Sequence, residues 1–356
     1  MNRAITAMVL LGLPIAAQAQ SSVTMFGLID AGITYTSNQG GHHSFTEQTG
    51  IQAPDLFGVH GVEDLGGGYS ALFVLDGSFA LNTGAQSGGG IFGRESYVGI
   101  STPYGALTLG NQFDYMYDNL SVARWGNQIP YVSLYQLPGG PFSRLGSPLG
   151  TFDYTRMAGG VATNNTVKFT SNTYAGFNVG AMYGFSNLAG GTNTDNMMSF
   201  GANYAAGPIR LNAAYTYARQ DSINDGHNGI RNFGFGGRYD FGKLALDGVY
   251  VNTRNTFNGA HVDTFEAGAL YSFAPDVFAY LQYIYADGNA VLTDNKSNQI
   301  GLTLDYLLSK RTDVYVNWVY QHASGNADVI ADISGAPGAS SNGTQTIVRV
   351  AMRHLF

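Results

Sequence analysis

The sequence predicts an all-β protein: a transmembrane antiparallel β-barrel of about sixteen strands, with a long third loop folded into the lumen. Composition gives the first indication, because 44% of the residues are hydrophobic but only 12% are charged, whereas soluble domains carry about 25% charged residues. A wall that faces lipid accounts for the missing charge, since its outer side chains must be apolar or aromatic. The other two indications are a period-two alternation of polar and apolar residues and an alternation of short and long connections.

The N-terminal residues predict a secretory signal peptide. Arg3 precedes an apolar run from Ala4 to Ala17, and the small-residue sequence Ala17-Gln18-Ala19 follows. We expect cleavage after Ala19, which leaves residues 20–356 as the barrel. The apolar run is shorter than the ~20 residues that a spanning helix needs.

From Ser22 onward, segments of roughly ten residues alternate between apolar and polar side chains, as the strands of membrane barrels do. In residues 298–308 one parity carries Ile300, Leu302, Leu304, Tyr306 and Leu308, and the other carries Gln299, Gly301, Thr303 and Asp305. We expect the first set to face lipid and the second to face water. The same rule near the C-terminus places Arg349 and Arg353 in the lumen.

Short turns and long polar loops alternate along the chain, as they do in outer-membrane barrels. The turns are expected at residues 66–68, 103–105, 174–176, 206–208, 241–243, 274–276 and 308–310. The loops are expected at residues 37–50, 83–90, 114–163, 187–196, 220–228, 254–262, 287–295 and 323–342. This division gives about sixteen strands, an even number that lets the first strand pair with the last and leaves no open edge. A barrel of that size is wide enough for an aqueous channel.

The third loop, about 114–163, is far longer than the others and holds four of the ten prolines. Loops of this length within a compact domain are usually functional. A position inside the barrel would keep its backbone near water and would narrow the lumen, so the sequence predicts a sieve.

Several motifs spread over the whole chain carry a family resemblance. They are Ser22-Val23-Thr24-Met25-Phe26-Gly27-Leu28-Ile29-Asp30, Gly61-Val62-Glu63-Asp64-Leu65-Gly66-Gly67-Gly68, Phe92-Gly93-Arg94-Glu95-Ser96-Tyr97-Val98-Gly99, Gly105-Ala106-Leu107-Thr108-Leu109-Gly110, Leu308-Ser309-Lys310-Arg311-Thr312 and the terminal Phe356. With these motifs the sequence resembles the Gram-negative general diffusion porins, especially the trimeric sixteen-stranded type of β-proteobacteria.

The resemblance implies a water-filled channel in the Gram-negative outer membrane, through which small hydrophilic solutes and ions diffuse passively. The implied partners are two further copies of the chain in a homotrimer, outer-membrane lipid and lipopolysaccharide, and the barrel-assembly machinery, for which Phe356 would be the recognition signal. The resemblance also implies an eyelet, in which acidic residues of the third loop face basic residues of the wall.

The eyelet of this chain departs from the family pattern. Members often carry basic residues at the positions that match Leu56, His60 and Asn111, and only Arg156 is retained as a basic residue. The residues expected at the pore constriction are therefore Arg156, His60, Asn111, Leu56, Asp114, Asp118 and Arg124. Charged members would sort ions, Asn111 would be a neutral lining residue, and Leu56 would form an apolar patch.

Two other functions are open at this point. A substrate-selective porin for organic acids, sugars or aromatic compounds is one alternative, motivated by the weakened basic wall and the tyrosine-rich third loop. An outer-membrane barrel hydrolase is a distant alternative, because the seven histidines have no serine and carboxylate at a spacing that requires a triad. We therefore expect no enzyme, no catalytic residue and no cofactor.

Metal and nucleic-acid binding are also not expected. The adjacent His42 and His43, with Glu47, lack an implied third ligand of a metal site, because adjacent side chains of an extended chain point apart. The formal net charge of −7 argues against a nucleic-acid partner.

Overall fold

The computed structural model describes residues 22–125, 132–147, 152–160, 162–191, 193–325 and 329–356. The signal peptide predicted at residues 1–19 lies outside this described part of the chain. No helix among the described residues is long and apolar enough to cross a membrane.

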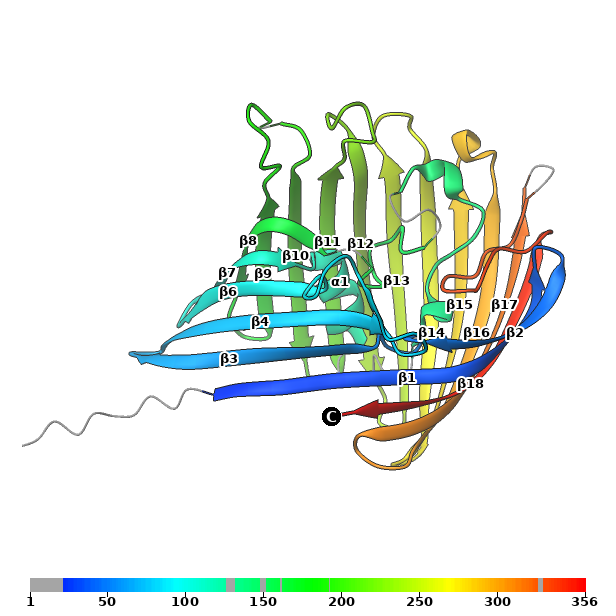
Figure 1. Ribbon diagram of the computed structural model, residues 1–356, viewed down its shortest axis with the longest axis horizontal. Coiled ribbons are helices and arrows are strands. Elements are labelled where there is room, and N and C mark those ends of the chain that lie inside the picture. The colour runs from blue at the N-terminus through cyan, green and yellow to red at the C-terminus, as the bar shows by residue number, and fades with distance from the viewer. Residues whose placement is uncertain (1–21, 126–131, 148–151, 161, 192, 326–328) are drawn as a thin grey trace, which may run out of the picture.

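Sixteen strands form the wall of the molecule in the described residues (Figure 1). They are β1 (Ser22–Gln39), β3 (Leu56–Gly66), β4 (Tyr69–Ala80), β6 (Glu95–Thr102), β7 (Gly105–Gln112), β8 (Thr163–Ser171), β9 (Phe177–Gly184), β10 (Met197–Ala206), β11 (Ile209–Arg219), β12 (Gly229–Asp240), β13 (Leu244–Asn255), β14 (His261–Ala274), β15 (Val277–Gly288), β16 (Lys296–Leu307), β17 (Thr312–Ser324) and β18 (Thr344–Leu355). Two shorter strands, β2 (His42–Thr49) and β5 (Ala85–Ser87), pair antiparallel with the C-terminal parts of β1 and β4.

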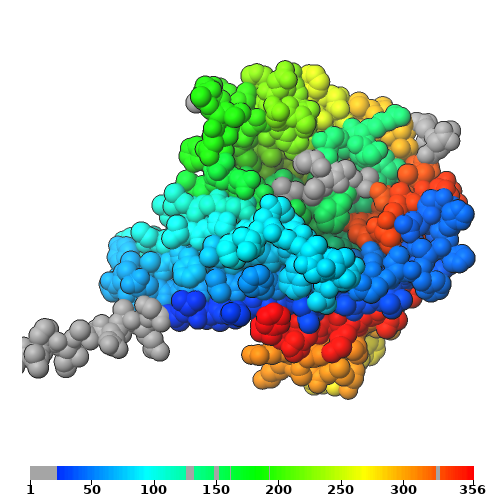
Figure 2. All heavy atoms as spheres, viewed as in Figure 1, coloured from blue at the N-terminus to red at the C-terminus, as the bar shows by residue number. Residues whose placement is uncertain are grey.

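The sheet closes on itself as an antiparallel barrel. Each wall strand pairs with the next along the chain, and β1 pairs with β18 from Leu28 opposite Leu355 to Thr36 opposite Ile347. Figure 2 shows the N-terminal and C-terminal strands, in blue and red, meeting on one face. Closure satisfies the backbone groups that an open edge would expose to lipid, so the fold class predicted from alternation is confirmed.

The two faces of the wall differ as the alternation predicts. On β16, Gln299, Thr303 and Asp305 are at most 3% exposed, whereas Leu304 and Tyr306 are nearly half exposed. Arg349 and Arg353 of β18 lie on the polar buried face, as predicted. We call the polar face the inner face, because the barrel is closed and its other face carries the exposed apolar side chains.

The predicted connections are confirmed with two corrections, of which the smaller is that the loop expected at residues 83–90 contains the short strand β5. All seven predicted turns fall between consecutive wall strands. Residues 37–50, however, were expected to form a loop, and they instead continue β1 to Gln39 and return as β2. Gly40 and Gly41 both have positive φ and form a tight two-residue hairpin turn, and the rings of Tyr35 and Phe45 pack 5.1 Å apart across the pair.

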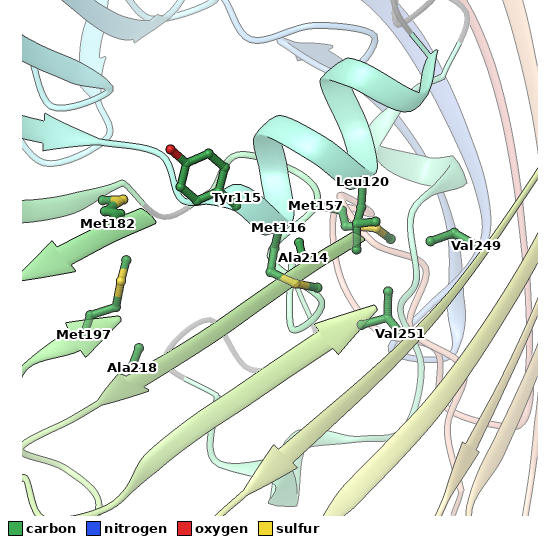
Figure 3. Packing of buried hydrophobic residues seen from close by; sticks show 10 residues of the cluster. All are labelled: Tyr115, Met116, Leu120, Met157, Met182, Met197, Ala214, Ala218, Val249 and Val251. Atoms are coloured by element: carbon green, nitrogen blue, oxygen red, sulfur yellow. The ribbon is translucent and has the colours of Figure 1, made fainter. Parts of the chain in front are cut away.

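The third loop, residues 113–162, contains short helical turns in its described parts. They are α1 (Tyr115–Tyr117), η1 (Asp118–Ala123), η3 (Leu134–Gln136) and η4 (Ser143–Leu145). Figure 3 shows α1 and η1 lying beside the strands, where Met116 and Leu120 belong to one buried cluster with Ala214 and Val251. The loop and the inner face of the wall therefore share one apolar cluster.

Candidate functional site

The two ends of the third loop are joined by an ion pair. Asp114 caps α1, since its Oδ1 accepts hydrogen bonds from the backbone N–H groups of Met116 and Tyr117. Its other oxygen binds the guanidinium of Arg156, which is only 8% exposed. Arg156 adopts a positive φ of 62°, a strained conformation for a residue with a side chain. The structure thus brings these two predicted residues together, and their charges neutralise each other.

Asp153 holds the turn beside Arg156. Its carboxylate accepts hydrogen bonds from the backbone N–H groups of Ala158 at 2.7 Å and Gly160 at 2.8 Å. Burial nevertheless raises the pKa of Asp153 to about 6, because removing the charged form from water outweighs the two hydrogen bonds.

Asp118 is paired with a wall lysine. Its Oδ2 lies 2.5 Å from the ammonium of Lys168, which also donates to the carbonyl of Phe113. Burial raises the pKa of Asp118, and the neighbouring ammonium opposes that rise. Sequence analysis did not select Lys168, although its alternation with Thr166 and Thr170 on β8 signals an inward position.

Arg124 anchors the middle of the loop to the wall. It is fully buried and lies 3.4 Å from Glu266 on β14 and 3.9 Å from Asp247 on β13. Its guanidinium stacks 4.3 Å from the ring centroid of Trp125, whose indole N–H donates to Asp247. Arg144 of η4, in contrast, is exposed. Arg124 is therefore a loop anchor with compensated charge.

A second anchor fastens η3 to the opposite part of the wall. The hydroxyl of Tyr135 donates to Gln48 at 2.5 Å and lies 3.0 Å from the hydroxyl of Thr34 on β1. Burial raises the pKa of Tyr135 to about 12, so the phenol stays protonated. The side chain of Gln136 accepts a hydrogen bond from Thr303 on β16. The loop thus contacts strands on both sides of the closure.

The three wall residues predicted for the constriction occupy different environments. Leu56 lines a pocket of about 150 Å³ together with Tyr117 and Trp125 of the third loop. His60 lies four residues after Leu56 on the same face of β3. Its side chain is exposed, and its ring centroid lies 5.5 Å from that of Phe26. Asn111 donates to the carbonyl of Gly93 at 3.0 Å, at the point where the pairing of β7 with β8 is interrupted. The structure joins Leu56 to the loop cluster and bonds Asn111 to backbone.

Arg94 connects the near wall to the third loop. Its Nε lies 3.1 Å from Asp76 on β4, and a second nitrogen donates to the hydroxyl of Tyr117. The neighbouring Glu95 stands opposite Asp76 in the register of β6 with β4. Neither Asp76 nor Glu95 was predicted as a site residue from the sequence, because their convergence depends on strand register.

Comparison with known proteins places this barrel in a family. The sequence profile described as "Gram-negative porin" matches residues 4–326. The chain belongs to this family. It is 28% identical over 371 residues to outer membrane porin protein 32 of Delftia acidovorans, with all of both chains covered. It is also 28% identical over 377 residues to an outer membrane porin protein of Bordetella pertussis, covering 89% of this chain and 93% of the relative.

A solved structure has the same architecture as this porin. The anion-selective porin from Comamonas acidovorans aligns with a TM-score of 0.79 and 24% identity, covering 95% of this chain and 100% of that one. At this identity the likeness concerns the fold. Family, relatives and barrel together place this porin in the Gram-negative outer membrane.

The C-terminal residue of the porin closes the seam of the barrel. The backbone N–H of Phe356 donates to the carbonyl of Gly27, and the N–H of Gly27 donates to the carbonyl of Phe356. A Cβ atom at position 27 would lie 2.2 Å from the end of the Phe356 ring, so a larger residue at this position would displace the ring. Among the residues that the structure describes, no group of three or more His, Cys, Asp or Glu side chains is arranged to hold a metal ion.

Proposed function

We propose that this porin is a passive, water-filled channel for small hydrophilic solutes and ions, with the third loop lying inside the bore as the size filter. The observation that carries the proposal is the distribution of loop contacts. They reach the inner faces of β1, β8, β10, β12, β14 and β16. A segment bonded to strands so far apart around a barrel is most simply accommodated within it.

The open part of the bore lies between the loop and the β3–β4 side. A pocket of about 300 Å³ is lined by Pro54, Asp55 and Ser78 on one side and by Phe152 and Gly159 on the other. The 150 Å³ pocket beside Leu56 and Trp125 adjoins it through four shared lining residues, Pro54, Arg94, Leu134 and Ala158. We propose that these spaces belong to the solute path.

In this proposal, the residues expected at the constriction have different roles. Arg156, Asp114 and Arg124 position the loop, because each is buried and bound to an opposite charge. Leu56, His60 and Asp118 line the path, whereas Asn111 supports the end of β7. Solute selection therefore depends mainly on loop position and on the charge left uncompensated beside it.

Ion-current measurements test the proposal. Detergent-purified protein added to a planar lipid bilayer should produce discrete current steps whose conductance rises nearly in proportion to salt concentration. Liposome swelling should be fast with small sugars and slow with larger oligosaccharides. Absence of current and of swelling would contradict the channel.

A substrate-selective channel is the second candidate, and the apolar lining of the smaller pocket favours it. Leu56, Tyr117, Trp125, Leu134 and Leu137 surround that space, and aromatic rings provide stacking surfaces for rings or sugars. Conductance that saturates with salt, or is blocked by one solute, would identify this candidate.

The remaining expectations belong to the same proposal. We propose a homotrimer that is exported by residues 1–19, inserted by the barrel-assembly machinery through Phe356, and surrounded by lipid and lipopolysaccharide. A barrel of the same fold from Vibrio cholerae, at 16% identity and a TM-score of 0.66, is described as a trimer form. In this proposal the channel performs no chemical reaction. His60, His261 and His354 make their described contacts on three separate strands and do not combine into one site.

A further inference from the structure

We propose that this channel favours small cations over anions, and that Glu95 supplies the fixed charge that ions meet in the passage. The inference rests on the proposed function, since it assigns a selectivity to the same bore. It differs from the selectivity stated for the Comamonas acidovorans structure.

Carboxylates outnumber basic groups around the bore. The basic side chains of the inner face and the described third loop are Arg94, Arg124, Arg144, Arg156, Lys168, Arg210, Arg238, Arg349 and Arg353. The acidic side chains of the inner face, the third loop and the approach to β3 are Asp30, Asp55, Asp76, Glu95, Asp114, Asp118, Asp153, Asp240, Asp247, Glu266, Asp305 and Asp313. The second set is larger, so the formal charge around the bore is negative.

The basic groups are almost all engaged by carboxylates. Every basic residue of that set except the exposed Arg144 has a carboxylate oxygen within 4.0 Å. An arginine held by a carboxylate presents little net charge to a passing anion. Arg210 and Arg238 share the one carboxylate of Asp240, so this group keeps a formal charge of +1. The other paired basic groups offer a passing anion little uncompensated charge.

Four carboxylates of the set have no basic group within that distance among the described residues: Asp55, Glu95, Asp153 and Asp305. Asp55 and Asp153 are buried and accept backbone hydrogen bonds, so they are structural. Asp305 is 3% exposed and packs near Asp313. Asp153 and Asp305 are shielded from the passage. Asp55 borders the 300 Å³ pocket, but it is only 1% exposed and both of its oxygens accept hydrogen bonds from backbone N–H groups.

Glu95 differs from the other three because it is partly exposed. No hydrogen bond or ion pair within 4.0 Å joins its carboxylate to another described residue. Two compensated pairs flank it, Arg94 with Asp76 and Lys168 with Asp118. This local group of five charges therefore has a formal charge of −1, centred on Glu95.

A fixed negative charge in a water passage with low-dielectric walls concentrates cations and repels anions. At about 7 Å in water, one unit charge changes the local concentration of a monovalent ion about threefold. Removing the Glu95 charge should lower the cation-to-anion permeability ratio by a factor of this order.

Reversal potentials test the inference. The native protein and the Glu95→Gln variant are compared in zwitterionic bilayers across a tenfold KCl gradient at pH 9, where a partly buried glutamate carboxyl is ionised. The reversal potential of the native channel should have the sign expected for K⁺ flux down the gradient, and Glu95→Gln should move this potential toward zero. Glu47→Gln is the matched control, because Glu47 is exposed on β2 opposite Ile33, on the outer face.

A charge-conserving variant separates charge from folding. Glu95→Asp should retain the cation preference, whereas a merely structural role would make both variants lose current or folded yield together. An anion-preferring native channel, or equal reversal potentials for native protein and Glu95→Gln, would overturn the inference while leaving the channel proposal intact. Absence of any current would instead overturn the channel proposal, and this inference with it.

Discussion

The third loop meets two sides of the barrel in different ways. Toward β8 and β10–β17 it is bonded and packed, with Arg124, Tyr115 and Tyr154 each reaching wall side chains or backbone. Toward β3, β4 and β6 we find no hydrogen bond from the described loop residues to those strands, and two pockets lie between. Arg94, just before β6, and Ile51, ahead of β3, connect the loop to this side through Tyr117 and the backbone N–H of Leu134.

In the proposed channel, this difference combines a fixed filter with an open path. Buried ion pairs on the packed side mainly fix the position of the loop. Their net contribution to stability is small, because the attraction between the charges offsets the cost of removing both from water. Partly exposed groups on the open side, such as His60 and Glu95, remain available to solutes. In the proposed channel, a constriction residue therefore acts by holding the loop in position on the packed side and by contact with solutes on the open side.

Breaking an anchor on the packed side should have the largest effect. Arg124→Ala leaves Glu266 and Asp247 without their buried cation, and such a loss costs about 3–5 kcal/mol. We expect a lower unfolding midpoint, measured by the heat-induced shift of the folded band in gel electrophoresis, together with noisier single-channel current.

Arg144→Ala is the control for Arg124→Ala, because Arg144 is exposed on the same loop. It should leave the unfolding midpoint unchanged. Glu266→Gln combined with Arg124→Ala should recover part of the loss, since it removes one of the uncompensated charges. Equal midpoints for native protein and Arg124→Ala would show that this anchor does not hold the loop.

A pH series should have an intermediate effect that is local to the turn of Asp153. Because burial raises the pKa of Asp153 from 3.8 to about 6, the folded turn binds this proton more tightly than the unfolded chain does. Its stabilising contribution is complete below about pH 4 and is lost as the pH rises through about 6. Hydrogen exchange of residues 153–160, corrected for intrinsic rates, should therefore accelerate between pH 4 and 7.

Asp153→Asn should flatten this pH dependence, because the side chain no longer titrates. Asp225→Asn is the matched control: Asp225 shares the φ of 50° but is exposed. Corrected exchange rates in the native turn that do not change with pH would contradict the assignment.

A substitution on the open side should change stability least. His60→Asn removes an exposed ring whose described contact is with Phe26, so the free energy of unfolding should stay within about 0.5 kcal/mol of the native value. Single-channel conductance should change, because a smaller side chain then borders the passage. His322→Asn, exposed on the outer face of β17, should change neither quantity, and identical conductance for both variants would remove His60 from the solute path.

The strands and turns were predictable because their signals are local. In β16 the alternation of Gln299, Thr303 and Asp305 with apolar neighbours separates the two faces within ten residues of chain. The hairpin of β1 and β2 was missed although Gly40-Gly41 is a local turn signal, because the polar residues around it resemble a loop. Lys168 was missed for a different reason: its inward parity was visible, but its partner Asp118 lies fifty residues away.

By itself, the sequence determined a closed, lipid-facing barrel, since period-two alternation and turn residues act over a few positions of chain. Only the tertiary structure decided which charges compensate one another. Arg349 meets Asp30 across 319 residues, and Arg124 meets Glu266 across 142. Strand register and barrel closure set these distances, and Coulomb energies depend on distance in space, so the residue left with free charge beside the passage could be identified only in the folded chain.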